Sequence, residues 1–159
     1  MRKLWNRAPM AMWSLSTVDK NGEGNMNICG YVTSISIEPK ILLLAVYHHT
    51  KTLANLKQNP RALLQLLTTS HVDIVHTCGR QSGNSADKLT KVSKKHEVGE
   101  VGGLSYMKDA AGYMELEIRD LLEIGGDHLL AVAEVVRTKN LADAPILTSE
   151  YLREKGIIR

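Results

Sequence analysis

Residues 113–119 read Tyr-Met-Glu-Leu-Glu-Ile-Arg, and residues 125–136 read Gly-Gly-Asp-His-Leu-Leu-Ala-Val-Ala-Glu-Val-Val. In the first stretch apolar and charged side chains alternate, which is typical of a strand with one buried face and one solvated face. The Gly-Gly-Asp at 125–127 predicts a turn, and residues 128–136 predict a long strand. Because the two strands can pair antiparallel across this turn, the stretch favours an antiparallel sheet.

Four further stretches predict strands, because each is apolar or nearly so and is bounded by turn formers. Residues 19–24 read Asp-Lys-Asn-Gly-Glu-Gly and predict a hairpin loop after the first of them. The continuous apolar run at residues 41–46 is expected to be buried on both faces. The four predicted strands are Met10–Val18, Met26–Val32, Ile41–Val46 and Ala62–Leu67.

Short helices are expected between and after these strands. In residues 50–60, Thr50 or Thr52 can cap the first turn, and Asn59 before proline ends the helix. Residues 71–92 predict two short helical pieces around a glycine-containing loop. The tail at residues 147–155 predicts another short helix, which we expect to pack on a partner subunit.

The elements give at least six strands without regular βαβ alternation, which argues against a Rossmann-type sheet. No repeat of roughly 20 to 50 residues indicates a solenoid. We therefore predict a mainly β, α+β fold, an antiparallel barrel with helical insertions. At 159 residues the chain should form a single domain covering residues 1–159.

Composition excludes some partners. The 20 Lys and Arg residues are interspersed with 17 Asp and Glu residues, so nucleic acid is not expected as a ligand. No run approaches the roughly 18 to 20 apolar residues that a membrane span needs, so no membrane association is expected. Cys29 and Cys78 make neither a disulfide framework nor a zinc pattern. Together with the charged, interrupted N-terminal stretch, they predict a cytoplasmic protein.

Four polar segments interrupt the apolar pattern. The longest, Cys78–Lys88, holds two glycines and two cations, which suit a loop around a phosphate. The start of the helix after His49 offers free N–H groups and Lys51 to an anion. Thr33–Ser36 offers hydroxyls, and Gly126-Asp127-His128 offers an imidazole. Each segment also has a purely structural reading, as a connector, a helix cap, a strand end or a hairpin turn.

A metal site is not expected from this sequence. The adjacent His48 and His49 follow a strand, where consecutive side chains point to opposite faces and cannot chelate one ion together.

In this order, the four polar segments resemble the flavin reductase-like, FMN-binding split-barrel family, over about residues 8–140. The specific parts are the Cys-Gly-x-x-Ser-Gly element at 78–83 with Asp87-Lys88, and the Gly-Asp-His turn at 126–128. The resemblance implies a Greek-key split β-barrel that forms a homodimer and holds FMN without a covalent bond.

The resemblance also implies roles for individual residues. It places the flavin ring against Thr33, Ser34, Ile35 and Ser36, with Asn27 close by. It places the ribityl phosphate against His49, Thr50, Lys51, Thr52, Asn55, Ser82, Gly83 and Lys88. His128 would lie where a nicotinamide docks, as the catalytic residue.

Three functions remain open at this point. The first is an NAD(P)H-dependent flavin oxidoreductase, in which a hydride passes from NADH or NADPH to flavin and its electrons continue to a downstream acceptor. The second is an FMN-containing electron carrier of the flavoredoxin type, without a nicotinamide site of its own. The third is a nucleic-acid-binding barrel. Because a flavin itself carries the redox chemistry, the first two need no catalytic triad from the protein.

Overall fold

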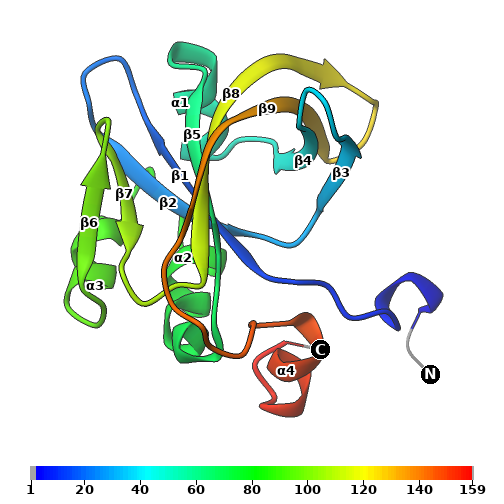
Figure 1. The fold of residues 1–159 in the computed structure, drawn as a ribbon, viewed down its shortest axis with the longest axis vertical. Coiled ribbons are helices and arrows are strands. Elements are labelled where there is room, and N and C mark those ends of the chain that lie inside the picture. Colours follow the sequence, from blue (N-terminus) through cyan, green and yellow to red (C-terminus); the bar gives the residue numbers. More distant parts are fainter. Residues whose placement is uncertain (1–2, 159) are drawn as a thin grey trace.

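The computed structural model describes residues 3–158, and its body is one seven-stranded antiparallel sheet (Figure 1). The strand order is β2-β1-β5-β8-β9-β4-β3. A separate two-stranded sheet pairs β6 (Val98–Val101) with β7 (Leu104–Met107). The strands of the large sheet are β1 (Trp13–Val18), β2 (Gly24–Cys29), β3 (Val32–Ser36), β4 (Ile41–Tyr47), β5 (Arg61–Leu66), β8 (Gly112–Glu123) and β9 (His128–Asn140).

The sheet curls into an incompletely closed barrel. Figure 1 shows β8 and β9 arching across the top of the molecule toward β4 and β3. The chain leaves β4 through α1 (Lys51–Gln58) and reaches β5, which is separated from β4 in the sheet by β9 and β8. This crossing gives the Greek-key connectivity. The predicted mainly β, antiparallel split-barrel fold is therefore confirmed.

The remaining helices are short and surround the sheet. Two of them are 3₁₀ helices, η1 (Leu4–Asn6) and η2 (Thr69–Ile74). The others are α2 (Val75–Arg80), α3 (Lys88–Ser93) and α4 (Ser149–Glu154). Within residues 3–158, no helix combines the length and apolar character needed to cross a bilayer.

Helix α1 begins and ends as its residues require. The Thr50 hydroxyl accepts a hydrogen bond from the backbone N–H of Leu53 at 3.2 Å, so Thr50 is the N-cap. Asn59 has an extended backbone because proline follows it, and the helix stops there. Leu53 and Leu56 are buried against the barrel core, which fixes the position of the helix start.

Two apolar clusters lie on opposite sides of β1 and β5. The first fills the barrel with side chains such as Leu44, Leu64 and Ala131. The second packs α2, α3 and α4 against the outer side, around Met26 and Leu67. Strands β1 and β5 are consequently buried on both faces.

The predicted strand 26–32 is wrong at its C-terminal end. Strand β2 stops at Cys29, and Val32 begins β3 at the opposite edge of the sheet. Between them the backbone N–H of Val32 donates to the carbonyl of Gly30 at 3.1 Å, which forms a tight turn. The chain therefore changes direction in the middle of the predicted strand.

One burial prediction is also wrong. In β4, Leu42 and Leu44 are buried, but Leu43 and Ala45 on the other face are only half-buried, because that face lines an apolar cavity of about 550 Å³. The tail forms helix α4, which packs on its own chain, and its contact with a partner subunit stays a prediction. Its Leu152 is fully buried in the outer cluster of this same chain.

Candidate functional site

Three of the four polar segments predicted from the sequence meet at one cavity of about 520 Å³. Its walls come from β2, from the end of β4 and the start of α1, from the loop between α2 and α3, and from the first residue of β9. Segments far apart in the sequence thus converge here. The sequence-predicted residues that line it are Asn27, His49, Thr50, Lys51, Thr52, Ser82, Gly83, Lys88 and His128.

Other predicted site residues lie elsewhere. Thr33, Ser34, Ile35 and Ser36 are on β3 at the sheet edge and do not line this cavity. The Ser34 hydroxyl accepts a hydrogen bond from Lys40 at 2.6 Å, and Thr33 lines a different, apolar cavity. Their position follows from the pairing of β3 with the outer side of β4.

Asn55 is also outside the cavity. Its side chain is fully buried and donates a hydrogen bond to the Thr17 hydroxyl at 3.2 Å. Because it lies one turn into α1 on the core side, it holds the helix on β1 rather than facing a ligand.

The start of α1 forms one wall of the cavity. The Thr50 hydroxyl accepts from Leu53 and donates to the carbonyl of Tyr47 at 2.8 Å. His49, the residue before it, has φ = 61°, a left-handed conformation that is uncommon for a side chain of this size. Non-glycine residues in this region cluster at functional sites, and the turn aims the helix N-terminus at the cavity.

Lys88 brings a buried positive charge to the cavity. Its side chain is 4% exposed, and its ammonium donates to the Asn27 side-chain oxygen and to the Cys78 carbonyl, both at 3.2 Å. Among the described residues, no carboxylate forms an ion pair with it. Burial lowers the pKa of Lys88 below its ordinary value of 10.5. An anion in the cavity would relieve this cost, and the third N–H of the ammonium is available to it.

The other lysine of the cavity is already neutralised. The Lys51 ammonium lies 3.3 Å from Glu23 and 3.6 Å from Asp19. Both carboxylates belong to the β1–β2 hairpin region. Lys51 therefore ties this hairpin to α1, and Lys88 is the better candidate to bind an anion.

The glycine of the Ser82-Gly83 pair is required by packing. A Cβ atom at Gly83 would lie 2.1 Å from the Asn25 side-chain oxygen and 3.0 Å from Cβ of Lys51. The loop thus touches β2 and α1 through bare backbone. Ser82 and Gly83 are held at the mouth of the cavity by this contact.

Cys78 and Arg80 of the same motif differ in their access to the cavity, because Arg80 lines it and Cys78 does not. Cys78 is fully buried, and burial raises the pKa of its thiol to about 11, so it stays protonated and unreactive near neutral pH. The Arg80 guanidinium donates to the carbonyl of Ile157 at 2.7 Å. Cys78 therefore supplies no chemistry to a ligand, whereas Arg80 brings a further cation to the cavity wall.

His128 forms the opposite end of the cavity among aromatic rings. Its ring packs edge-on against Tyr47 and Tyr31, with centroids 5.0 and 5.8 Å away. Its Nδ1 lies 2.5 Å from a carboxylate oxygen of Asp127, and this hydrogen bond lowers the pKa of Asp127. A second cavity of about 180 Å³ adjoins this end, sharing Asn27, Tyr47 and His128 with the first.

Sequence reasoning missed Asn25, Tyr31 and Tyr47 at this site. Asn25 donates to the Thr52 hydroxyl at 3.0 Å and carries the close contact with Gly83. Tyr47 stands directly before the polar segment at 48–52, so an aromatic residue at the end of a buried strand was an available signal.

The geometry suits a ligand with two unlike ends. One end of the cavity offers a buried ammonium and a helix N-terminus, which bind anionic oxygens. The other end offers aromatic rings and an imidazole, which suit a planar heterocycle. The combined volume lies in the range of cofactor pockets.

Comparison with known structures shows the same fold. The chain aligns with an FMN-binding protein from Thermus thermophilus at TM-score 0.74 and 21% identity, covering 88% of this chain and 75% of that one. It aligns with an NADH:FAD oxidoreductase from Streptomyces globisporus at TM-score 0.78 and 18% identity, covering 92% and 85%.

A third similar structure comes from Sinorhizobium meliloti 1021, at TM-score 0.78 and 17% identity. The alignment covers 96% of this chain but 53% of that protein, so this chain spans about half of its length. No curated protein sequence matches the chain significantly. The sequence model of the family described as "Flavin reductase like domain" matches residues 5–153, nearly the whole chain. The chain therefore belongs to the flavin reductase-like domain family.

Proposed function

We propose that this chain is a flavin-dependent oxidoreductase that binds FMN in the cavity between Lys88 and His128 and accepts electrons from NADH or NADPH. The observation that carries the proposal is the buried Lys88 ammonium, which faces a cofactor-sized cavity without a carboxylate partner among the described residues. When bound, the flavin supplies the redox chemistry by accepting a hydride from the nicotinamide. The chain's own residues bind and orient the two nucleotides.

The phosphate of FMN fits the cationic end. Lys88 would donate a charge-assisted hydrogen bond, and the first N–H groups of α1 after Thr50 would donate further bonds. Ser82 and Gly83 close this end from the opposite side. Because Lys51 is paired with two carboxylates, its contribution would be smaller.

The ring of FMN fits the aromatic end. Ile28 and Tyr47 line both cavities and offer apolar surface to a planar ring. Asn27 also lines both cavities and is oriented by its hydrogen bond from Lys88. The proposal therefore places the ring against Tyr47 and His128 rather than against Thr33–Ser36 on β3.

His128 would position the nicotinamide nucleotide. Its imidazole is partly exposed at the rim, and Asp127 holds its Nδ1, which leaves Nε2 facing away from that carboxylate. A ring fixed in this way can stack on a nicotinamide or hydrogen-bond to its carboxamide. Reducing equivalents would then pass to a downstream acceptor.

We also propose a homodimer. The half-buried face of β4 lines an apolar cavity of about 550 Å³ together with Met10 and Leu130. Beside it Tyr31 is 56% exposed, and Trp5 near the N-terminus is 70% exposed. Exposed apolar surface of this kind marks interaction sites, and a second copy of the chain would cover it.

A reducing cytoplasm is the compartment that we propose. Cys29 and Cys78 are both free thiols, and neither forms a disulfide. Such a composition suits a compartment in which thiols stay reduced.

The test is an anaerobic titration of the purified protein with FMN, followed by NADH or NADPH. We expect a shift of the flavin absorbance bands on binding and bleaching of the bound flavin by one of the two donors. A protein that causes no spectral change at micromolar concentration contradicts flavin binding. A protein that binds FMN but bleaches with neither donor favours the electron-carrier function.

A further inference from the structure

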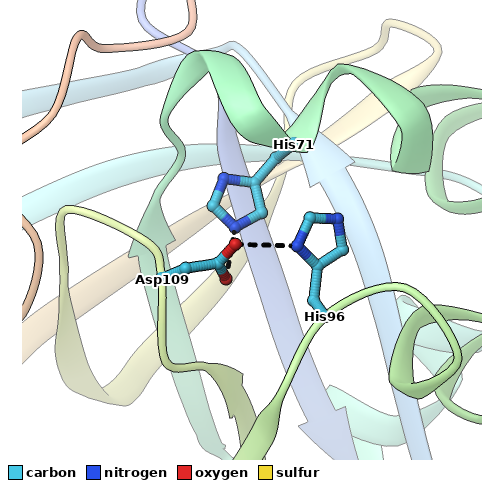
Figure 2. A group of neighbouring side chains, drawn as sticks. All are labelled: His71, His96 and Asp109. Carbon is cyan, nitrogen blue, oxygen red and sulfur yellow. Dashed lines mark hydrogen bonds and ion pairs between the residues drawn. The ribbon is translucent and has the colours of Figure 1, made fainter.

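A second group of chemically capable side chains lies outside the candidate cavity. Figure 2 shows His71, His96 and Asp109 directed toward one another. They come from η2, from the segment between α3 and β6, and from the turn after β7. None of the three lines the cavity described above.

His71 is held in a fixed orientation. It is fully buried, and its Nε2 lies 3.0 Å from one carboxylate oxygen of Asp109. Its other ring nitrogen, Nδ1, lies 2.9 Å from the hydroxyl and 3.3 Å from the carbonyl of Thr68. The ring therefore presents Nε2 to Asp109 and rests on Thr68 at its far side.

His96 has the matching arrangement. Its Nδ1 lies 2.8 Å from the second carboxylate oxygen of Asp109, and its Nε2 lies 2.8 Å from Asp73. The two imidazole rings are stacked with centroids 4.7 Å apart. Both histidines thus direct one nitrogen at the same carboxylate, while a separate partner fixes the other nitrogen.

This pattern is the one that metal-binding histidines show. The inner donor atoms of His71, His96 and Asp109 all lie within 4.8 Å of one another. Two imidazole nitrogens and a carboxylate form a usual donor set for Zn²⁺. Histidine ligands of metals usually donate the second ring N–H to an acceptor. Asp73 is such an acceptor beside His96, and the Thr68 hydroxyl and carbonyl are acceptors beside His71.

We propose that His71, His96 and Asp109 bind a Zn²⁺ ion, with His71 Nε2, His96 Nδ1 and the Asp109 carboxylate as ligands. The side chain of Asp109 is 46% exposed, so an ion can enter and solvent water can complete its coordination. On binding, each inner nitrogen gives up its hydrogen bond to Asp109, and any displaced proton passes to water.

Binding changes the tautomer of His71. Without the ion, the backbone N–H of Thr68 donates to Nδ1 at 3.1 Å, so the ring proton is on Nε2. With Nε2 on the ion, Nδ1 carries the proton and donates it to the Thr68 hydroxyl or carbonyl, and the Thr68 backbone N–H gives up its hydrogen bond to Nδ1. This switch is a spectroscopic signature that a hydrogen-bonded cluster without an ion does not give.

The ion would act as a structural staple. It would join η2, the segment after α3 and the turn at the base of the β6–β7 hairpin. The last two are already joined by the hydrogen bond from the Lys108 N–H to the Glu97 carbonyl at 2.9 Å, so the ion would chiefly tie η2 to them. An ion that binds the folded chain and not the unfolded chain stabilises the folded state. We therefore expect Zn²⁺ to raise the unfolding temperature.

The experiment is equilibrium dialysis of metal-stripped protein against Zn²⁺, with metal analysis and thermal unfolding. We expect wild type to bind one more Zn²⁺ per chain than H96Q and D109N, and to unfold at a higher temperature with Zn²⁺ than without it. H76Q is the matched control, because His76 is exposed on the neighbouring α2 and makes no contact with the cluster. It should behave as wild type.

Further measurements show whether the effect is specific to Zn²⁺ at this site. D73A removes the partner of a ligand and should weaken Zn²⁺ binding about tenfold. Mg²⁺, which prefers oxygen ligands, should leave the unfolding temperature unchanged. NMR of the histidine side chains should show the tautomer of His71 switching on addition of Zn²⁺.

Equal Zn²⁺ uptake by wild type and D109N overturns the proposal, as does an unfolding temperature that Zn²⁺ leaves unchanged or that Mg²⁺ raises equally. If H96Q fails to fold, D109N decides, because the exposed Asp109 tolerates replacement by an amide of the same shape.

Discussion

Lys88 and His96 are both largely buried basic side chains, yet their surroundings are opposite. The Lys88 ammonium contacts two neutral oxygens, from Asn27 and Cys78, and burial lowers its pKa. His96 lies between the carboxylates of Asp73 and Asp109. Burial lowers the pKa of His96, but the hydrogen bonds to these carboxylates outweigh burial and raise it.

The difference shows which charges the protein leaves uncompensated. Around Lys88 an anion is missing, and the cavity beside it is large enough to admit one. Around His96 a cation is required, which either a proton on the ring or the proposed metal ion can supply. The first region therefore suits an anionic cofactor, and the second suits a cation.

Removing the positive charge of Lys88 should have the largest effect on FMN binding. We expect Lys88→Ala to weaken FMN binding by about ten- to a hundredfold, because a charge-assisted hydrogen bond contributes about 1.5 to 3 kcal/mol. Riboflavin, which lacks the phosphate, should bind the variant and wild type alike. Fluorescence titration with both flavins measures this.

The matched control is Lys91→Ala, on the same helix. Lys91 is exposed and does not line the cavity itself, although its ammonium contacts the side chain of Gln81, which does. The Lys91→Ala variant should bind both flavins as wild type does. An equal loss for FMN and riboflavin in Lys88→Ala would mean that Lys88 supports the fold and does not bind the phosphate.

Filling the space at Gly83 should disturb the same end of the cavity. The added Cβ meets Asn25 and Lys51, so we expect Gly83→Ala to lower the free energy of unfolding by about 1 to 3 kcal/mol and to weaken FMN binding. Gly126→Ala is the control, because a Cβ there meets nothing within 4 Å. Urea denaturation compares the two variants. Equal stability for both would contradict the packing role of Gly83.

At the aromatic end, His128→Ala should separate binding from reduction. We expect an increase in KM for the nicotinamide nucleotide, or slower flavin reduction, by roughly fivefold, as for the loss of one interaction of about 1 kcal/mol. FMN affinity should stay near the wild-type value, because the phosphate contacts are at the other end. Anaerobic stopped-flow bleaching measures the rate, and an unchanged rate and KM would limit His128 to a structural role in the hairpin.

The smallest expected effect is on the pH dependence of the free energy of unfolding. Because the pKa of Lys88 is lowered in the folded protein, the unfolded chain binds more protons between that lowered pKa and 10.5. The flavin-free protein should therefore gain stability as pH rises through this window. Lys88→Met should lose this part of the slope in urea denaturation. A wild type and a variant with the same pH dependence would contradict an uncompensated charge at Lys88.

Much of the fold could be predicted from local patterns. The alternation at 113–119 and the Gly-Gly-Asp turn identified β8, β9 and their antiparallel pairing, which the register of Leu116 with Val135 confirms. The β6–β7 hairpin was missed, although Gly102-Gly103 has the left-handed dihedrals of a tight hairpin turn. The half-buried face of β4 could not be predicted, because an apolar run does not reveal whether other parts of the same chain will cover it.

The parts of the candidate site that depend on residues close together in the sequence could be predicted. The capping of α1 depends on neighbouring residues, and Thr50 is one of the two caps that the sequence predicted. The contact of Lys88 with Asn27 joins positions 61 residues apart, so its geometry depends on the fold. The same holds for the cluster of His71, His96 and Asp109, which has no short sequence spacing typical of metal sites. For this reason the sequence predicted no metal ligands there.

A crystal structure of the protein with bound FMN tests directly whether Lys88 binds the phosphate of the flavin. We expect the phosphate within hydrogen-bond distance of Lys88 Nζ and of the first N–H groups of α1, and the flavin ring beside Tyr47 and His128. A phosphate bound away from Lys88, or a ring bound on β3 against Thr33–Ser36, would contradict it.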